Sequence, residues 1–190
     1  MQAFAANVLE AYYAPRASAR RIIAAGPDPQ ECFLMVVLAF AVQALVGDAW
    51  LLMVEGGRLP GLGARAFEFM LQVLLFVILV AGVHGIGRRF GGTANQPEVA
   101  AVVAWHYLVT AFLAPLNVIG MSAVDSEGAG PAFLLTPISV AISIWLFASF
   151  VAEAHGFRRI GGVILASVGG FAALGFLAML AFGLFAGAPR

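Results

Sequence analysis

Long uncharged hydrophobic runs alternate with short polar segments along most of this chain. Each run has about 20 residues, the length that an α-helix needs to cross a bilayer core of about 30 Å. The five runs lie at about residues 32–54, 66–87, 99–121, 131–152 and 160–186. They are continuous rather than alternating with a period of two, which favours helices over barrel strands. The pattern predicts an all-α, polytopic integral membrane bundle with five transmembrane helices.

The residues before the first run have a different pattern. An apolar face recurs at helical spacing, formed by Phe4, Val8, Ala11 and Tyr12. A second short helix is predicted to begin at Pro15 and to end at Gly26. Both helices are too short to cross a bilayer, so we interpret residues 1–31 as amphipathic helices at the membrane interface, or alternatively as an arm that binds a soluble partner. The membrane domain is then residues 32–187.

Composition supports a membrane protein. The chain is 62% hydrophobic and 11% charged, whereas a soluble domain has about 45–50% and about 25%. Ten arginines balance ten acidic residues without any lysine, so no net field attracts nucleic acid, and none is predicted as a partner. The single cysteine, Cys32, excludes an internal disulfide and a cysteine-rich metal site.

The arginines predict the orientation of the chain. With a cytoplasmic N-terminus, seven arginines fall on the cytoplasmic side and three on the other. The positive-inside rule therefore predicts a cytoplasmic N-terminus and a periplasmic C-terminus. The exclusive use of arginine, together with abundant glycine and proline, is typical of GC-rich bacterial codons. The predicted location is the bacterial inner membrane.

A short motif recurs at the ends of two predicted spans. His84–Gly92 reads HGIGRRFGG and His155–Gly162 reads HGFRRIGG. Glycine can end the helix and turn the chain, while the arginines meet the headgroups. With an earlier pair, the candidate surface for anionic lipid or an acidic partner is Arg20, Arg21, Arg88, Arg89, Arg158 and Arg159. Each arginine near an anionic leaflet contributes about 1 kcal/mol, although topology and anchoring alone also explain the pairs.

Polar residues inside the predicted spans are the second set of candidates, because such residues are costly in lipid. They are Gln43, Asp48, Gln72, His84, His106 and Asn117. Asp48, Gln72 and Asn117 are expected toward the outer side and the histidines toward the inner side. They can bridge helices, reach headgroups or line a transport cavity. Pro115 is expected to kink the third span, and Pro137 the fourth.

No catalytic constellation is present in the sequence. It lacks GxSxG, HExxH and a phosphate loop that ends in lysine, and the histidines lack the short spacing of metal ligands on one helix. We therefore predict no enzyme, cofactor or metal site. A small-residue pair, Gly183 and Gly187, favours close helix packing within the bundle or, alternatively, self-association.

The second loop and its continuation resemble the bacterial branch of the Yip (Ypt-interacting protein) domain family. The resemblance rests on the segment RRFGGTANQPEVAAVVAWHYLVTAFLAPL. The residues that stand at the family's positions are Gly91, Gly92, Gln96, Glu98, Ala104, Tyr107 and Pro115. It implies a five-span membrane protein with a cytoplasmic N-terminus. The long N-terminal region and the Asp-Leu-x-Gly-Pro motif of eukaryotic members have no counterpart here, so GTPase binding is not implied.

These observations favour a non-enzymatic membrane protein that acts as an adaptor, assembly factor, accessory subunit or membrane-organising component. Its expected partners are the bilayer, anionic lipids and other membrane proteins. The alternative is a small transporter or channel subunit, which requires the intramembrane polar residues to converge on one continuous cavity.

Overall fold

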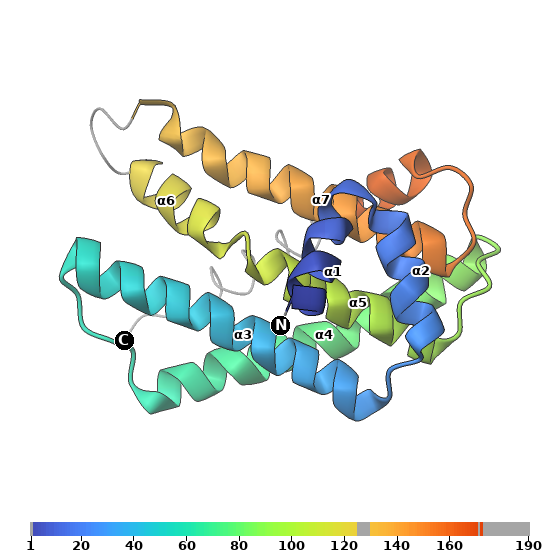
Figure 1. Ribbon diagram of the computed structural model, residues 1–190, viewed down its shortest axis with the longest axis horizontal. Coiled ribbons are helices and arrows are strands. Elements are labelled where there is room, and N and C mark those ends of the chain that lie inside the picture. Colours follow the sequence, from blue (N-terminus) through green and yellow to red (C-terminus); the bar gives the residue numbers. More distant parts are fainter. Residues whose placement is uncertain (1, 125–129, 171, 173–190) are drawn as a thin grey trace, which may run out of the picture.

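A computed structural model of the chain describes residues 2–124, 130–170 and 172, and the regular elements in these ranges are all helical. In chain order they are α1 (Gln2–Tyr13), α2 (Pro15–Ala25), α3 (Pro29–Trp50), η1 (Leu51–Glu55), α4 (Leu62–Arg89), α5 (Gln96–Ala111), α6 (Ala114–Val124), η2 (Gly130–Leu134), α7 (Leu135–Ala154) and a short apolar helix, Gly161–Gly170 (Figure 1). The predicted all-α class is confirmed for these residues.

Three described helices are long and apolar enough to cross a membrane. They are Pro29–Val54, Leu62–Arg89 and Pro131–Ala154, and they contain the first, second and fourth predicted runs. A fourth span is formed if Gln96–Ala111 and Ala114–Ala123, which are bent by 54° relative to each other, cross together. The described residues therefore hold three spans, or four with the bent pair, and five spans are not confirmed.

The predicted fifth run falls mostly outside the described residues. Its first part is the helix Gly161–Gly170, which has 10 residues and is too short to cross alone. The Gly183 and Gly187 pair also lies outside the described residues.

The bend in the third run lies where a proline was expected to act. Pro115 cannot donate a backbone hydrogen bond, and the helix breaks just before it, where the Leu113 N–H donates to the Thr110 carbonyl at 2.9 Å. The kink at Pro115 is confirmed. Pro137 instead lies in the first turn of α7, where a missing N–H costs little, and Pro131–Ala154 counts as one unbroken candidate span.

The core of the bundle is built around α5. Ten of its 16 residues are buried, because α3, α4, α7 and α2 all pack against it (Figure 1). By contrast, only Val80 and Gly87 are buried among the 28 residues of α4. The apolar side chains of α4 therefore face outward over most of its length, as expected for a helix that meets lipid.

Helices α1 and α2 form where the sequence predicts them, but their apolar face packs on the membrane helices. Val8, Ala11 and Ala19 are buried in one cluster with Trp105 of α5. The Trp105 Nε1–H donates to Ser18 Oγ at 2.9 Å. This face is therefore covered by the bundle, and the placement of residues 1–31 at the membrane interface stays a prediction.

A second hydrogen bond fixes α1 on the bundle. The Tyr12 hydroxyl donates to the Val109 carbonyl at 2.7 Å, and burial raises the pKa of Tyr12 to about 12. Val109 lies two residues before the end of α5, close to the break that precedes α6. The hydroxyl thus supplies a hydrogen bond to a part of the helix where the regular ladder is about to end.

Candidate functional site

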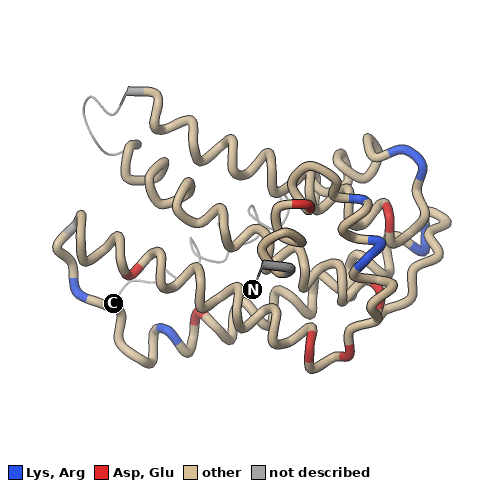
Figure 2. Tube along the Cα trace, in the orientation of Figure 1, with Lys and Arg blue, Asp and Glu red and all other residues tan. Residues whose placement is uncertain are grey.

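The basic segments at the end of α4 and just after α7 lie at one end of the bundle (Figure 2). Both helices end in the same turn, with a left-handed glycine at Gly91 (φ 83°) and at Gly156 (φ 70°). The N–H of the next residue then donates to the carbonyl five positions earlier, at 2.9 Å from Gly92 and 2.8 Å from Phe157. These are Schellman caps, but they fall at different positions of the motif, because Gly91 follows the first arginine pair and Gly156 precedes the second.

The two loops interlock through His155. Its ring is buried and lies so close to Gly87 and Gly92 that a Cβ atom at either position would overlap it. The Thr93 N–H also donates to the His155 carbonyl at 3.3 Å. Burial is the main cause that lowers the pKa of His155, and the nearby charge of His84 acts in the same direction.

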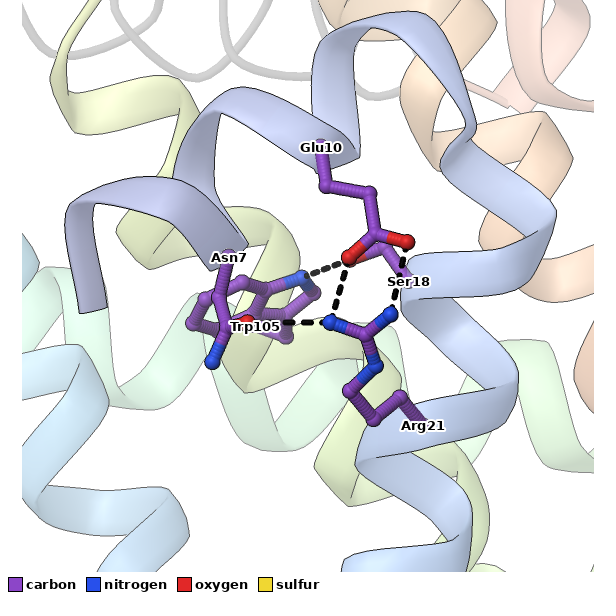
Figure 3. Close-up of polar contacts among 5 residues, drawn as sticks. All are labelled: Asn7, Glu10, Ser18, Arg21 and Trp105. Atoms are coloured by element: carbon purple, nitrogen blue, oxygen red, sulfur yellow. Dashed lines mark hydrogen bonds and ion pairs between the residues drawn. The ribbon is translucent and has the colours of Figure 1, made fainter. Parts of the chain in front are cut away.

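The arginines of α2 are used to attach the N-terminal helices. Arg20 Nε pairs with Glu153 at the end of α7, at 2.9 Å. Arg21 donates to Glu10 Oε1 at 2.7 Å and to Asn7 Oδ1 at 3.0 Å on α1 (Figure 3). Arg16 donates to the Phe157 carbonyl at 3.1 Å. This part of the predicted surface is therefore largely neutralised within the chain.

The other four predicted arginines are in a different state. Arg88, Arg89, Arg158 and Arg159 are exposed, and within the described residues none of their side chains has a hydrogen-bond or ion-pair partner. Arg88 and Arg89 end α4 and Arg158 and Arg159 follow α7, so four positive charges without a partner among the described residues lie at the same end of the bundle. The structure thus divides the six candidate arginines into paired residues on α2 and unpaired residues on the two loops.

An apolar groove begins at these loops. It has a volume of about 680 Å³ and lies between α4, the end of α7 and the helix Gly161–Gly170. Its walls are mainly aliphatic, aromatic and glycine residues, among them Val83, Ile86 and Phe157. Among the described residues that line the groove, Arg158 and Arg159 are charged and none is acidic.

A second, polar pocket of about 420 Å³ lies between α3, α4, α5 and α7. It brings together Gln43, Gln72 and His106, three of the six polar residues predicted to lie in the membrane. His106 is buried, and its Nε2 lies 3.1 Å from the Ser143 carbonyl oxygen. His106 Nδ1 and Gln72 Nε2 are buried without a hydrogen-bond partner in the described residues.

The other three predicted intramembrane residues lie elsewhere. Asp48 pairs with Arg65 at the opposite end of the bundle, and Asn117 accepts a hydrogen bond from Ser139 Oγ between α6 and α7. His84 lies beside the interlocked loops. The expected outer layer of Asp48, Gln72 and Asn117 is therefore divided among three locations.

The remaining polar residues of the pocket were not among the six predicted intramembrane polar residues, and they are Glu68, Tyr107, Thr110 and Ser143. Their polarity was visible, but four helices must be docked before they share a wall. No group of three or more His, Cys, Asp or Glu side chains within the described ranges is arranged to hold a metal ion. Cys32 is buried and unpaired with any other cysteine.

Comparison with known proteins gives one result. The Yip1 domain matches residues 9–183 of the chain, a range that includes the two loops, the groove and the polar pocket. No match was found among curated proteins or among solved structures.

Proposed function

Because the chain belongs to the Yip1 domain family, we propose that it is a non-enzymatic inner-membrane protein that organises anionic lipid at a cytoplasmic arginine surface. We define this surface as Arg88, Arg89, Arg158 and Arg159. In this proposal the ends of α4 and α7 face the cytoplasm and the C-terminus lies in the periplasm, as the distribution of arginines favours.

One observation supports this function above the others. The four arginines of the surface are exposed and have no acidic partner within the described residues, whereas Arg20 and Arg21 are paired with Glu153 and Glu10. An arginine that only anchors a helix end needs a single contact with any anionic headgroup. Four guanidinium groups without partners among the described residues, carried by two interlocked helix ends, can contact several anionic headgroups at once.

The test is to replace the four arginines with glutamine in the full chain and to reconstitute it into vesicles of phosphatidylcholine with 10% fluorescent phosphatidylglycerol. Energy transfer from a dye on the protein should show phosphatidylglycerol enriched around the unmodified chain and not around the variant. Protease accessibility must show the same orientation for both. Equal enrichment contradicts the proposal, and an acidic protein that copurifies only with the unmodified chain indicates an adaptor.

A second candidate function is a small transporter or channel subunit, and the polar pocket favours it. His106 Nδ1 and Gln72 Nε2 are buried without partners in the described residues, and such groups are costly unless water or a solute satisfies them. It ranks second because Asp48, His84 and Asn117 do not join the pocket. Five spans or fewer also form a thin bundle, so a pore would need several copies.

Stopped-flow light scattering with proteoliposomes tests this candidate, with glycerol and urea as the probes. The unmodified chain should raise permeability to at least one probe above that of empty vesicles, and His106→Phe, which replaces the imidazole nitrogens in the pocket wall with an apolar ring, should reduce the increase. Asn117→Leu is the control outside the pocket. Permeability equal to that of empty vesicles for both probes contradicts a pore for small neutral solutes.

A further inference from the structure

We infer that the apolar groove is a binding site for one anionic phospholipid, whose phosphate is held by Arg158 and Arg159 and whose acyl chain lies along α4. This inference rests on the proposed function and narrows it, from a surface that attracts many headgroups to a site that retains a single molecule.

The dimensions of the groove fit a lipid from one leaflet. Its α4 wall runs from Ile78 to Phe90, a distance of about 18 Å at a rise of 1.5 Å per residue. Half of the hydrocarbon core is about 15 Å thick. A chain that enters at the level of the arginines therefore reaches about the middle of the bilayer before the groove ends.

The chemistry of the groove changes along this length. The deep part is lined by residues such as Ile78, Leu79 and Val83, while Arg158 and Arg159 lie at the end where the spans meet the headgroups. Because both arginines are exposed and without partners in the described residues, they can donate to phosphate oxygens in the bidentate manner of guanidinium groups. An apolar wall that ends in two cations complements an anionic phospholipid and not a neutral solute.

Glycine keeps the groove open. Gly82 on α4 and Gly162 on the last described helix both line it, and a Cβ atom at either position would meet no other atom within 4 Å. A larger side chain at these positions therefore begins in free space and should extend into the groove. The same helices carry Gly85 and Gly161, which have equal free space but do not line the groove.

These pairs of glycines give matched variants. Gly162→Leu and Gly82→Leu should fill the groove, and Gly161→Leu and Gly85→Leu add the same side chain outside it. A charge-matched pair is also present, since Arg158→Gln with Arg159→Gln changes the groove, whereas Arg88→Gln with Arg89→Gln removes the same charge from a position that does not line it.

The experiment is native mass spectrometry of the full chain in detergent, titrated with dioleoyl phosphatidylglycerol and, separately, with dioleoyl phosphatidylcholine. We expect one phosphatidylglycerol to stay bound to the unmodified chain. The Arg158/Arg159 and the two groove-filling variants should weaken it roughly tenfold or more. The Arg88/Arg89 variant, which removes the same charge from the surface but not from the groove, should weaken it clearly less, and Gly161→Leu and Gly85→Leu should change it about threefold or less. Glycerol phosphate, which has the headgroup without acyl chains, should not displace it.

The outcomes separate this inference from the proposed function. If both arginine pairs weaken binding equally and Gly162→Leu and Gly82→Leu do not, the surface attracts lipid without a groove site, and only the inference fails. If no arginine variant changes binding or enrichment, both fail. A photoreactive residue at position 82 that cross-links to another part of this chain or to a second copy, rather than to lipid, also overturns the inference.

Discussion

The two ends of α4 are attached to the rest of the bundle by different forces. At its C-terminal end, Gly87 lies against the buried ring of His155, and the contact is steric. At its N-terminal end, Arg65 pairs with Asp48 of α3 and with Glu68, and the contact is electrostatic. The difference matters because α4 has almost no buried residues between these ends.

The comparison indicates where precision is needed in this fold. At the C-terminal end of α4, close packing leaves no room for an added atom. The two loops at this end should therefore keep a fixed geometry. Arg65 and Asp48 are both partly exposed, and their side chains can rearrange when one is changed. The candidate lipid site therefore lies at the sterically determined end, and the other end can tolerate variation.

Among the substitutions that test this comparison, a change at Gly87 should have the largest effect on the free energy of unfolding. Gly87→Ala places a methyl group in the space of the His155 ring and should lower the free energy of unfolding by about 3 kcal/mol. Gly85→Ala, on the same helix with no atom within 4 Å, should instead be neutral or stabilising by up to about 1 kcal/mol. Unfolding in mixed micelles by sodium dodecyl sulfate measures both, and equal values would break the contrast.

The pH dependence of stability tests His155 itself, with a smaller expected effect. Burial lowers its pKa in the folded state, so below the ordinary value of about 6.5 the unfolded chain binds more protons than the folded one. Stability should therefore fall as the pH decreases from 7.5 to 5.5. His155→Asn should reduce this fall, whereas a variant with the same fall as the unmodified chain would show that His155 is not responsible.

The ion pair at the N-terminal end of α4 should contribute still less to the free energy of unfolding. A double-mutant cycle with Asp48→Asn and Arg65→Gln is expected to give a coupling energy of about 1 kcal/mol, which decreases at high salt. The steric contact at the other end should be insensitive to salt. A coupling energy of zero would mean that α4 is held at its N-terminal end by apolar contacts only.

The smallest effect should come from Glu68, which pairs with Arg65 three residues earlier and is about half exposed. Glu68→Gln should cost about 0.3 kcal/mol, the usual value of such a pair on a helix. The same unfolding assay measures it against Glu98→Ala, which removes the capping-box side chain of α5 and should cost more.

Local features of the fold were predictable because they depend on neighbouring residues. The spans follow from runs of apolar residues, and α1, α2 and the kink at Pro115 follow from periodicity and proline chemistry. The partner of α1 and α2 was not predictable, because an apolar helix face fits lipid and protein equally well. The same limit applies to the arginines, whose division into paired and unpaired groups depends on Glu10 and Glu153.

The contact of His155 shows a different limit. The repeated motif was visible, and each copy contains a glycine turn, at Gly91 and at Gly156, yet it gave no sign that one histidine would be buried between glycines of the other copy. Gly87 is distant in sequence, and only the docked helices bring it to the ring. The polar pocket is similar, because Gln43, Gln72 and His106 come from three helices that must first assemble.

The hydrogen bond between Trp105 and Ser18 gives the protein an optical reporter of its own. The chain has three tryptophans, so replacing Trp50 and Trp145 with phenylalanine leaves one indole, which is buried at the contact between α2 and α5. Its emission spectrum then reads the environment of that contact directly. If a lipid, a detergent or a partner displaces the N-terminal helices, the indole is exposed and the wavelength of its emission shifts. No attached dye is needed to observe this.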